Sequence, residues 1–355
     1  MLPILPQPDS SALIALPNLL IVRLMSRCNN RCIFCMVDEE IHTSSDLPFE
    51  YAISAIEAQP ITTKIEFFGG EPTIYPNFLK LLEFARHRGH ECSLATHGRT
   101  FASERFTASV AELGTEHIYI RTSLYGDDAA LHDSYTAVPK SFDQTVRGIR
   151  NVVSAGFRSQ VNVVIMARNV DRLSEMTRLV HAWGVPRIKF SNLVNVDFCE
   201  REAVSLDVVA PRLQQAIALA EDLGLRVTVE KTPVCVAGGR LDLISTERLI
   251  GAWDRSHDDA GPCGQCLVRR WCDGVDPGYM PRFGSAGLEA VDMLPERAVQ
   301  HALGTSAEPE FLKVHCVRLP ANRDGDVSSE IGALGEEVDA RLGMLAVIPD
   351  RFIRV

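Results

Sequence analysis

Long unbroken apolar runs, an excess of basic residues and a basic leader are all missing from this sequence of 355 residues. The apolar start, residues 1–22, is interrupted by Pro3, Pro6, Pro8 and Asp9. It is therefore too broken to cross a bilayer, and it lacks the basic beginning of a signal peptide. The 36 basic residues are outnumbered by 46 acidic ones, which gives a net charge of −10. This balance gives no reason to bind a phosphate backbone or an anionic membrane. We therefore predict a cytoplasmic protein with no nucleic-acid or membrane partner.

The cysteines, ten in all, are what the sequence does have. In a reducing compartment they are expected to be metal ligands or buried small hydrophobes rather than disulfides. Cys28, Cys32 and Cys35 follow an apolar run directly, in the spacing C-x3-C-x2-C. Three thiolates on one short loop can converge on a four-iron cluster and leave its fourth iron open for a ligand. The alternative is a zinc site, but structural zinc needs four ligands and the nearest histidine is His42.

A repeat of short apolar strand and amphipathic helix begins at residue 19, and this pattern is typical of a parallel sheet covered by helices. We count six such units. They are too few to close the usual eight-stranded barrel, so the prediction is an α/β fold, a partial (β/α)6 TIM-like barrel with one open side. The predicted strands are 19–24, 64–68, 90–95, 117–123, 160–166 and 187–193, and the predicted helices are 48–59, 78–88, 103–113, 141–156, one closed by Gly184, and 207–223.

Polar and glycine-rich segments stand where the predicted strands end. Gly69-Gly70-Glu71-Pro72 follows the second strand, Thr96-His97-Gly98 the third, and Ser123 ends the fourth. Sites in such barrels lie at the C-terminal ends of the strands, so these segments and the cysteine loop are expected on one rim. Paired glycines allow a backbone to come close to a ligand, with Glu71 as an acceptor beside them.

These two motifs together resemble those of the radical S-adenosylmethionine (AdoMet) enzymes. In that family the cluster donates an electron to the sulfonium of a chelated AdoMet, which cleaves to methionine and a 5'-deoxyadenosyl radical that abstracts a hydrogen atom from substrate. The resemblance implies that the Gly69, Gly70 and Glu71 motif binds the methionyl amino group. It also implies that Ser123 binds the AdoMet ribose and that Asn162 faces the ligand.

His97 departs from the family pattern, because it stands where the family often has the Asn of Thr-Asn-Gly. Its role is left open, and a partly exposed rim histidine is the simplest expectation.

A second cysteine group follows the sixth helix. Cys263, Cys266 and Cys272 have the spacing C-x2-C-x5-C, and Cys235 lies upstream. Four thiolates are enough to close either an iron–sulfur cluster or a zinc ion, with disulfides as a further alternative. Next to such a barrel, the group resembles a Twitch or SPASM-type auxiliary cluster domain. We predict one auxiliary four-iron cluster, with Cys235 as the fourth ligand and Cys316 as the alternative.

We divide the chain into an N-terminal arm (1–18), a radical AdoMet barrel (19–230), an auxiliary cluster domain (231–300) and a C-terminal extension (301–355). The resemblance implies AdoMet and two four-iron clusters as cofactors and a one-electron donor such as flavodoxin or ferredoxin as partner. The predicted substrate is a small molecule of the sugar, aminocyclitol or nucleoside type. A peptide maturase is the nearest alternative, and a zinc-binding interaction protein is the alternative outside enzymes. Cys199, after the sixth strand, is a candidate hydrogen-atom donor.

Overall fold

The computed structural model describes residues 13–16, 18–35, 46–193, 199–244, 256–269, 272 and 274–293. Within them, eight strands form one sheet in chain order. Strand β1 is antiparallel to β2, and β2 to β8 are all parallel. The strands are β1 (Leu13–Leu16), β2 (Leu19–Arg23), β3 (Lys64–Phe68), β4 (Cys92–Thr96), β5 (Ile118–Leu124), β6 (Arg158–Ile165), β7 (Arg187–Asn192) and β8 (Arg226–Glu230).

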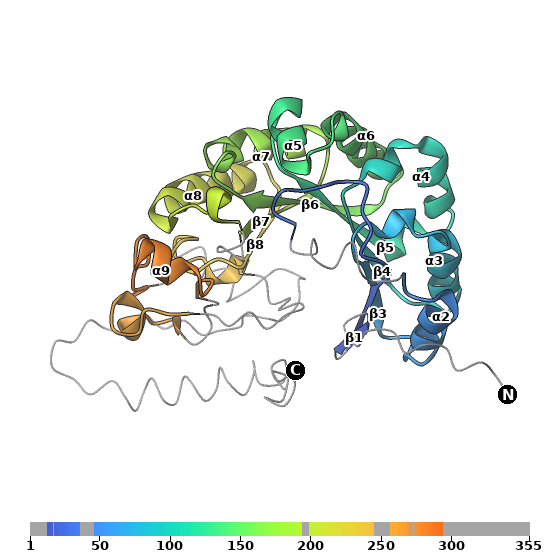
Figure 1. The fold of residues 1–355 in the computed structure, drawn as a ribbon, viewed down its shortest axis with the longest axis horizontal. Helices are drawn as coiled ribbons and strands as arrows, with labels where there is room; N and C mark the ends of the chain where they lie inside the picture. Colours follow the sequence, from blue (N-terminus) through green and yellow to red (C-terminus); the bar gives the residue numbers. More distant parts are fainter. Residues whose placement is uncertain are drawn as a thin grey trace.

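Figure 1 shows this sheet bent into an arc, with helices along its outer side and with β1 and β8 at its two edges. Each pair of successive parallel strands is connected through at least one helix. The result is a partial barrel, as predicted. The helices are α2 (Phe49–Glu57), α3 (Phe78–His87), α4 (Glu104–Ala111), α5 (Ala129–Thr136), α6 (Ser141–Ser154), α7 (Leu173–Ala182), α8 (Leu206–Asp222) and α9 (Tyr279–Phe283).

The helices follow from apolar periodicity and from glycine at their C-terminal ends. In α6, the buried residues include Thr145, Ile149 and Val152, which lie on one face of a helix with 3.6 residues per turn. Gly156 and Gly184 follow α6 and α7 with φ values of 80° and 77°. Because a side chain is strained at such angles, glycine marks where these helices stop.

The two faces of the sheet differ in chemistry. The outward face is apolar and packs against the helices, as Ile65, Phe67 and Ile188 do with no exposed surface. The residues that alternate with them include Glu66 on β3 and Lys189 on β7, which are 3% and 7% exposed. Glu66 pairs with Arg121 of β5, and Lys189 pairs with Glu230 of β8. Buried charges are costly unless paired, so the concave face is held by cross-strand ion pairs.

The six predicted strand–helix units are all present. The strands β1 and β8 and the helix α5 were missed, as was the short helix α9 beyond the sheet. Strand β1 lies inside the predicted N-terminal arm, where a four-residue antiparallel strand leaves little pattern. Strand β8 is only five residues long, and Val229 is its one fully buried residue. Helix α5 lies in the segment before residue 141 that was expected to be a loop. The sheet therefore has seven parallel strands rather than six.

The predicted C-terminal extension, 301–355, lies outside the described residues, as does Cys316. Among the helices that the structure describes, none is both long enough and apolar enough to span a bilayer.

Candidate active site

The cysteine loop continues from the C-terminal end of β2 and docks on the end of α5. The Arg31 N–H donates to the Thr136 carbonyl at 2.9 Å, and the Ile33 N–H donates to the Tyr135 carbonyl at 3.0 Å. The last carbonyls of a helix have no partner inside the helix, so these bonds satisfy both partners. A helix that the sequence did not reveal thus fixes the backbone between Cys28 and Cys35.

The aromatic residue before the third cysteine anchors the loop from inside. Phe34 is 9% exposed and meets Tyr125 and Tyr135 edge to face, with ring centroids 4.9 and 5.8 Å apart. Aromatic pairs prefer this geometry. The Phe34 ring therefore closes the barrel side of the loop with an apolar cluster.

The three thiols of the loop are partly buried and close enough to affect one another's ionisation. Burial raises the pKa of Cys28 to about 11, and the charges of Glu71 and Cys35 add to this effect. Burial raises the pKa of Cys32 even further, with contributions from Cys28 and Cys35. Grouped thiolates in such a place need a compensating cation, which a cationic iron–sulfur core supplies. The donor set therefore fits the cluster expected from the spacing.

The glycine pair packs tightly against the chain that leads from β2 into the loop. Gly69 has a φ of 137°, and a Cβ there would lie 2.4 Å from the Met25 carbonyl oxygen. A Cβ on Gly70 would lie 2.2 Å from the Arg27 carbonyl oxygen. The Gly70 N–H donates to Met25 O at 2.7 Å. Both glycines are thus required for the close approach of two backbones at the rim.

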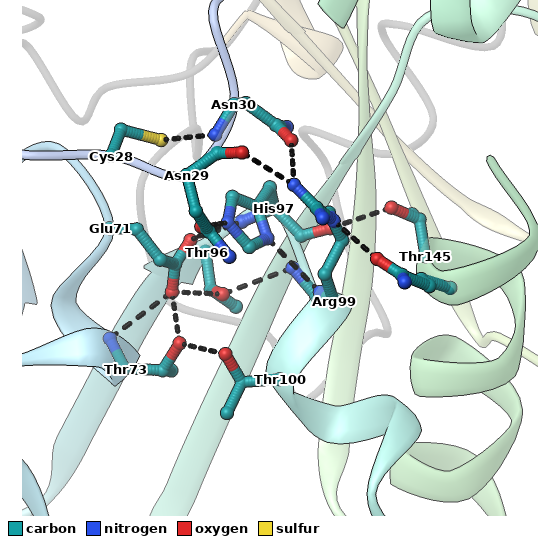
Figure 2. A network of polar contacts seen from close by, with 12 residues as sticks. Cys28, Asn29, Asn30, Glu71, Thr73, Thr96, His97, Arg99, Thr100 and Thr145 are labelled. Carbon is teal, nitrogen blue, oxygen red and sulfur yellow. Dashed lines mark hydrogen bonds and ion pairs between the residues drawn. The ribbon is translucent and has the colours of Figure 1, made fainter. Parts of the chain in front are cut away.

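Glu71 is fully buried and surrounded by donors, as Figure 2 shows. One carboxylate oxygen accepts from the Thr73 N–H at 3.1 Å and from the Thr96 hydroxyl at 2.7 Å. The Thr73 hydroxyl also donates to this oxygen. The other oxygen accepts the His97 N–H at 2.9 Å. These donors come from two different loops, so the carboxylate ties the end of β3 to the end of β4.

His97 is buried rather than partly exposed, with 7% of its surface accessible, so that expectation was wrong. Its Nδ1 accepts the Arg99 N–H at 3.0 Å, which places the proton of a neutral ring on Nε2. This Nε2–H faces the Asn29 side-chain oxygen at 2.5 Å. Burial lowers the pKa of His97 despite the opposing charge of Glu71, so the ring is neutral near pH 7.

Arg99 begins the short helix η3 (Arg99–Ala102) and also reaches the cysteine loop (Figure 2). Its Nη1 donates to the Asn29 carbonyl at 2.7 Å and to the Asn30 side-chain oxygen at 2.6 Å. Its Nε donates to Gln144 of α6 at 2.6 Å. Arg99 was not among the residues that the sequence predicted for this site. Its place two residues after His97 was the only available signal.

Ser123 and Asn162 are register partners on β5 and β6, at the same rim. The Asn162 side-chain oxygen accepts the Ser191 hydroxyl at 2.9 Å, and that hydroxyl also contacts Glu230 at 3.0 Å. The structure thus brings the two predicted ligand-facing residues side by side. The hydrogen bond from Ser191 on β7 also fixes the orientation of the Asn162 amide.

The second group of cysteines gathers around one pocket. Cys235, Cys263, Cys266 and Cys272 all line it, so the predicted fourth ligand lies with the other three. Burial raises the pKa of Cys235 to about 11. Backbone N–H groups point at the sulfurs: Val234 and Gly274 donate to Cys272, and Val291 donates to Cys266, each at 3.4 Å.

Within the part of the chain that the structure describes, no three His, Cys, Asp or Glu side chains converge closely enough to hold a single metal ion. A tetrahedral zinc ion needs its ligands at about 2.3 Å from one centre, whereas a four-iron cluster gives each thiolate its own iron. The four thiols that line the second pocket could therefore ligate either a four-iron cluster or a zinc ion.

Of the cysteines that the structure describes, two lie outside both groups. Cys199 is 5% exposed and packs with Phe34 and Tyr125, and burial raises its pKa to about 11. Cys199 therefore lies beside the cysteine loop, close to the rim of the barrel. Cys92 is buried in the apolar core on β4.

A partial barrel that carries a three-cysteine loop and a Gly-Gly-Glu turn on one rim is the arrangement that the resemblance to the radical AdoMet enzymes implied. Residues 22–180 match the family model of the Radical SAM superfamily. The match covers somewhat less than half of the chain, and it includes the cysteine loop and the Gly69-Gly70-Glu71 turn.

Curated relatives match a part of the chain. The mycofactocin maturase MftC of Mycobacterium tuberculosis is 29% identical over 161 residues, which cover 44% of this chain and 40% of the relative. The AdoMet-dependent heme synthase of Oleidesulfovibrio alaskensis is 28% identical over 165 residues, which cover 44% and 40%. The matches thus span about two fifths of these relatives' length.

Solved structures agree with the fold. Streptococcus suis SuiB bound to its precursor peptide SuiA superposes with a TM-score of 0.51 at 16% identity, covering 68% of this chain and 55% of SuiB. Native anSMEcpe with AdoMet and the Cp18Cys peptide gives a TM-score of 0.50 at 18% identity, covering 59% and 62%. At such identities the likeness supports the fold alone.

Proposed function

We propose that Cys28, Cys32 and Cys35 hold a four-iron cluster at which AdoMet is cleaved reductively. The observation that carries this proposal is the meeting of the three-thiol loop with the Gly69-Gly70-Glu71 turn on one rim of a radical SAM barrel. When bound, the cluster supplies one electron to the sulfonium of AdoMet.

The chain's own residues prepare this site. The end of α5 holds the loop backbone, and Phe34 with Tyr125 and Tyr135 keeps water from the inner side of the loop. Ser123 and Asn162 provide polar groups for the nucleoside on the concave face. The paired charges of Lys189 and Glu230 keep the floor of this face polar without leaving a charge unpaired.

We also propose that the second cysteine pocket holds an auxiliary four-iron cluster, which exchanges electrons with the substrate. Four thiols around one pocket and N–H groups aimed at their sulfurs support this assignment. The proposed domain boundaries, with the barrel ending near residue 230, place this cluster beyond β8. A flavodoxin or ferredoxin would deliver the electron in the cytoplasm.

For the substrate we propose a peptide rather than the small molecule first expected. The curated relatives include a maturase, and the solved relatives SuiB and anSMEcpe were each captured with a peptide. A small-molecule substrate remains the second candidate, because other relatives of the barrel segment are heme synthases.

The cleavage proposal is tested with anaerobically reconstituted protein, AdoMet and a strong reductant. The parent protein should contain about eight irons and form 5'-deoxyadenosine. Cys32→Ala should form none, because a loop with two thiolates cannot hold the cluster. Equal 5'-deoxyadenosine from Cys32→Ala and the parent would refute the proposal.

The substrate proposal is tested in the same reaction by mass spectrometry. Short peptides encoded beside the gene should change mass only when AdoMet and reductant are both present. Turnover of a porphyrin or sugar with no change in any such peptide would favour the second candidate.

A further inference from the structure

On the side away from α5, the segment between the first two cysteines of the loop contacts the turn after β4 and the start of η3. Asn29 and Asn30 are the residues contacted, and His97 and Arg99 are the residues that contact them. The Asn30 N–H in turn donates to the Cys28 sulfur at 3.3 Å. A continuous set of hydrogen bonds therefore runs from the rim to a proposed cluster ligand.

We propose that His97 and Arg99 form a polar clamp that fixes the conformation of the cysteine loop and so retains the cluster. This inference rests on the proposed function of the loop. Both are positioning residues, since neither contacts the thiols. In this clamp, the Glu71 side chain anchors His97 through the His97 backbone N–H.

The clamp has a rigid base. The His97 backbone donates to Glu71, and its carbonyl accepts the Thr145 hydroxyl of α6 at 3.0 Å. The Arg99 side chain is braced against α6 through Gln144. Because these contacts fix both side chains relative to the barrel, their hydrogen bonds also restrict the motion of the loop.

The contacts on the loop are specific in kind. Nε2–H of a neutral His97 meets an acceptor on Asn29, and the Arg99 guanidinium meets two acceptors, one from the backbone and one from Asn30. Arginine offers five donors in a planar fork, so one side chain can hold the loop and Gln144 together. On the loop's other side, the Arg31 and Ile33 N–H groups bind α5. The loop is thus held between two elements that are independent of the cysteines.

The experiment compares how fast variants lose the AdoMet-responsive cluster. Anaerobically reconstituted full-length protein is challenged with an iron chelator, and the EPR signal that changes on adding AdoMet is followed over time. His97→Leu and Arg99→Ala should lose this signal about tenfold faster than the parent, as expected when hydrogen bonds of this kind are removed.

A conservative replacement distinguishes positioning from a general packing role. Glutamine can place an N–H near the position of Nε2, whereas asparagine is too short to do so. His97→Gln should therefore retain the cluster like the parent, and His97→Asn should lose it like His97→Leu. His117→Gln and Arg158→Ala, whose side chains are 45% and 56% exposed, serve as matched controls and should behave like the parent.

Parent-like retention in both His97→Leu and Arg99→Ala would overturn the clamp. Equal loss in His97→Gln and His97→Leu would overturn the hydrogen bond to Asn29 as its basis. Arg99 lies at the rim, so Arg99→Ala decides the matter if His97→Leu does not fold. A parent protein that neither binds iron nor cleaves AdoMet would overturn the function itself, whereas a parent with full cleavage and indifferent variants overturns only the clamp.

Discussion

Replacing Glu71 by glutamine tests whether its carboxylate acts within the protein. The change keeps the shape of the side chain but turns one oxygen into an NH2 group. Each oxygen now accepts a backbone N–H, from Thr73 on one side and from His97 on the other. In either orientation, the new NH2 therefore faces a buried donor that cannot reverse its direction.

The magnitude follows from that unpaired donor. Leaving one buried donor without an acceptor costs about 1–3 kcal/mol. The threonine hydroxyls around Glu71 can rotate to accept from the amide, so they add little to this cost. For a domain of this size, the melting temperature should fall by about 2–4 °C for each kcal/mol.

The assay is urea unfolding of the reconstituted full-length protein without AdoMet. Glu71→Gln should lower the midpoint while the slope with denaturant stays the same, because the surface exposed on unfolding is unchanged. Glu57→Gln is the matched control, since the Glu57 side chain is 61% exposed and its ion pair with Arg88 is long, at 3.9 Å. A Glu71→Gln protein as stable as the parent and the control would refute the reasoning, and would point instead to a carboxylate that is free to bind a ligand.

Three further predictions concern other parts of the molecule. Cys266→Ala should leave AdoMet cleavage measurable but abolish substrate turnover, as judged by 5'-deoxyadenosine and product in the same reaction; unchanged turnover would contradict a role for the second pocket. Burial lowers the pKa of His132 to about 4, so the unfolded chain binds more protons between about pH 6.5 and 4. The free energy of unfolding should therefore fall by roughly 3 kcal/mol through that window, and a His132→Gln protein with the same pH dependence would contradict this assignment. Burial opposes ionisation of Glu230, but Lys189, Lys231 and the Ser191 hydroxyl together outweigh it and hold the Glu230 pKa below its usual value. The stability that this pair contributes is present above the ordinary carboxyl pKa and is lost as the pH falls through the lowered pKa of Glu230. In Glu230→Gln, the free energy of unfolding should therefore change less with pH in the acid range than in the parent.

The sequence predicted the parts of the fold that depend on local pattern. Apolar runs at 19–24 and 64–68 became buried central strands, and Gly156, Gly184 and Gly224 ended helices at positive φ. The cysteine loop, the glycine turn and Ser123 were placed on one rim because parallel strands align their C-terminal ends. These are consequences of spacing, which a sequence carries directly.

Contacts between distant loops were beyond that reach. Nothing local to Arg99 indicates that it bonds to Asn29 and Asn30, which lie about seventy positions earlier in the chain. His97 is buried beside Glu71, with its Nε2 3.2 Å from a carboxylate oxygen, whereas Glu71 was expected to face a ligand. Strand β8 is only five residues long, and its place at the edge of the sheet comes from its pairing with β7. Tertiary context decided all three.

The most direct test of the account is the EPR spectrum of the reduced, anaerobically reconstituted protein, recorded with and without AdoMet. Because a three-cysteine loop leaves one iron without a protein ligand, AdoMet should change the spectrum of one cluster, and Cys32→Ala should lose that response. A spectrum that AdoMet leaves unchanged, or a protein that takes up zinc in place of iron, would contradict the central claim.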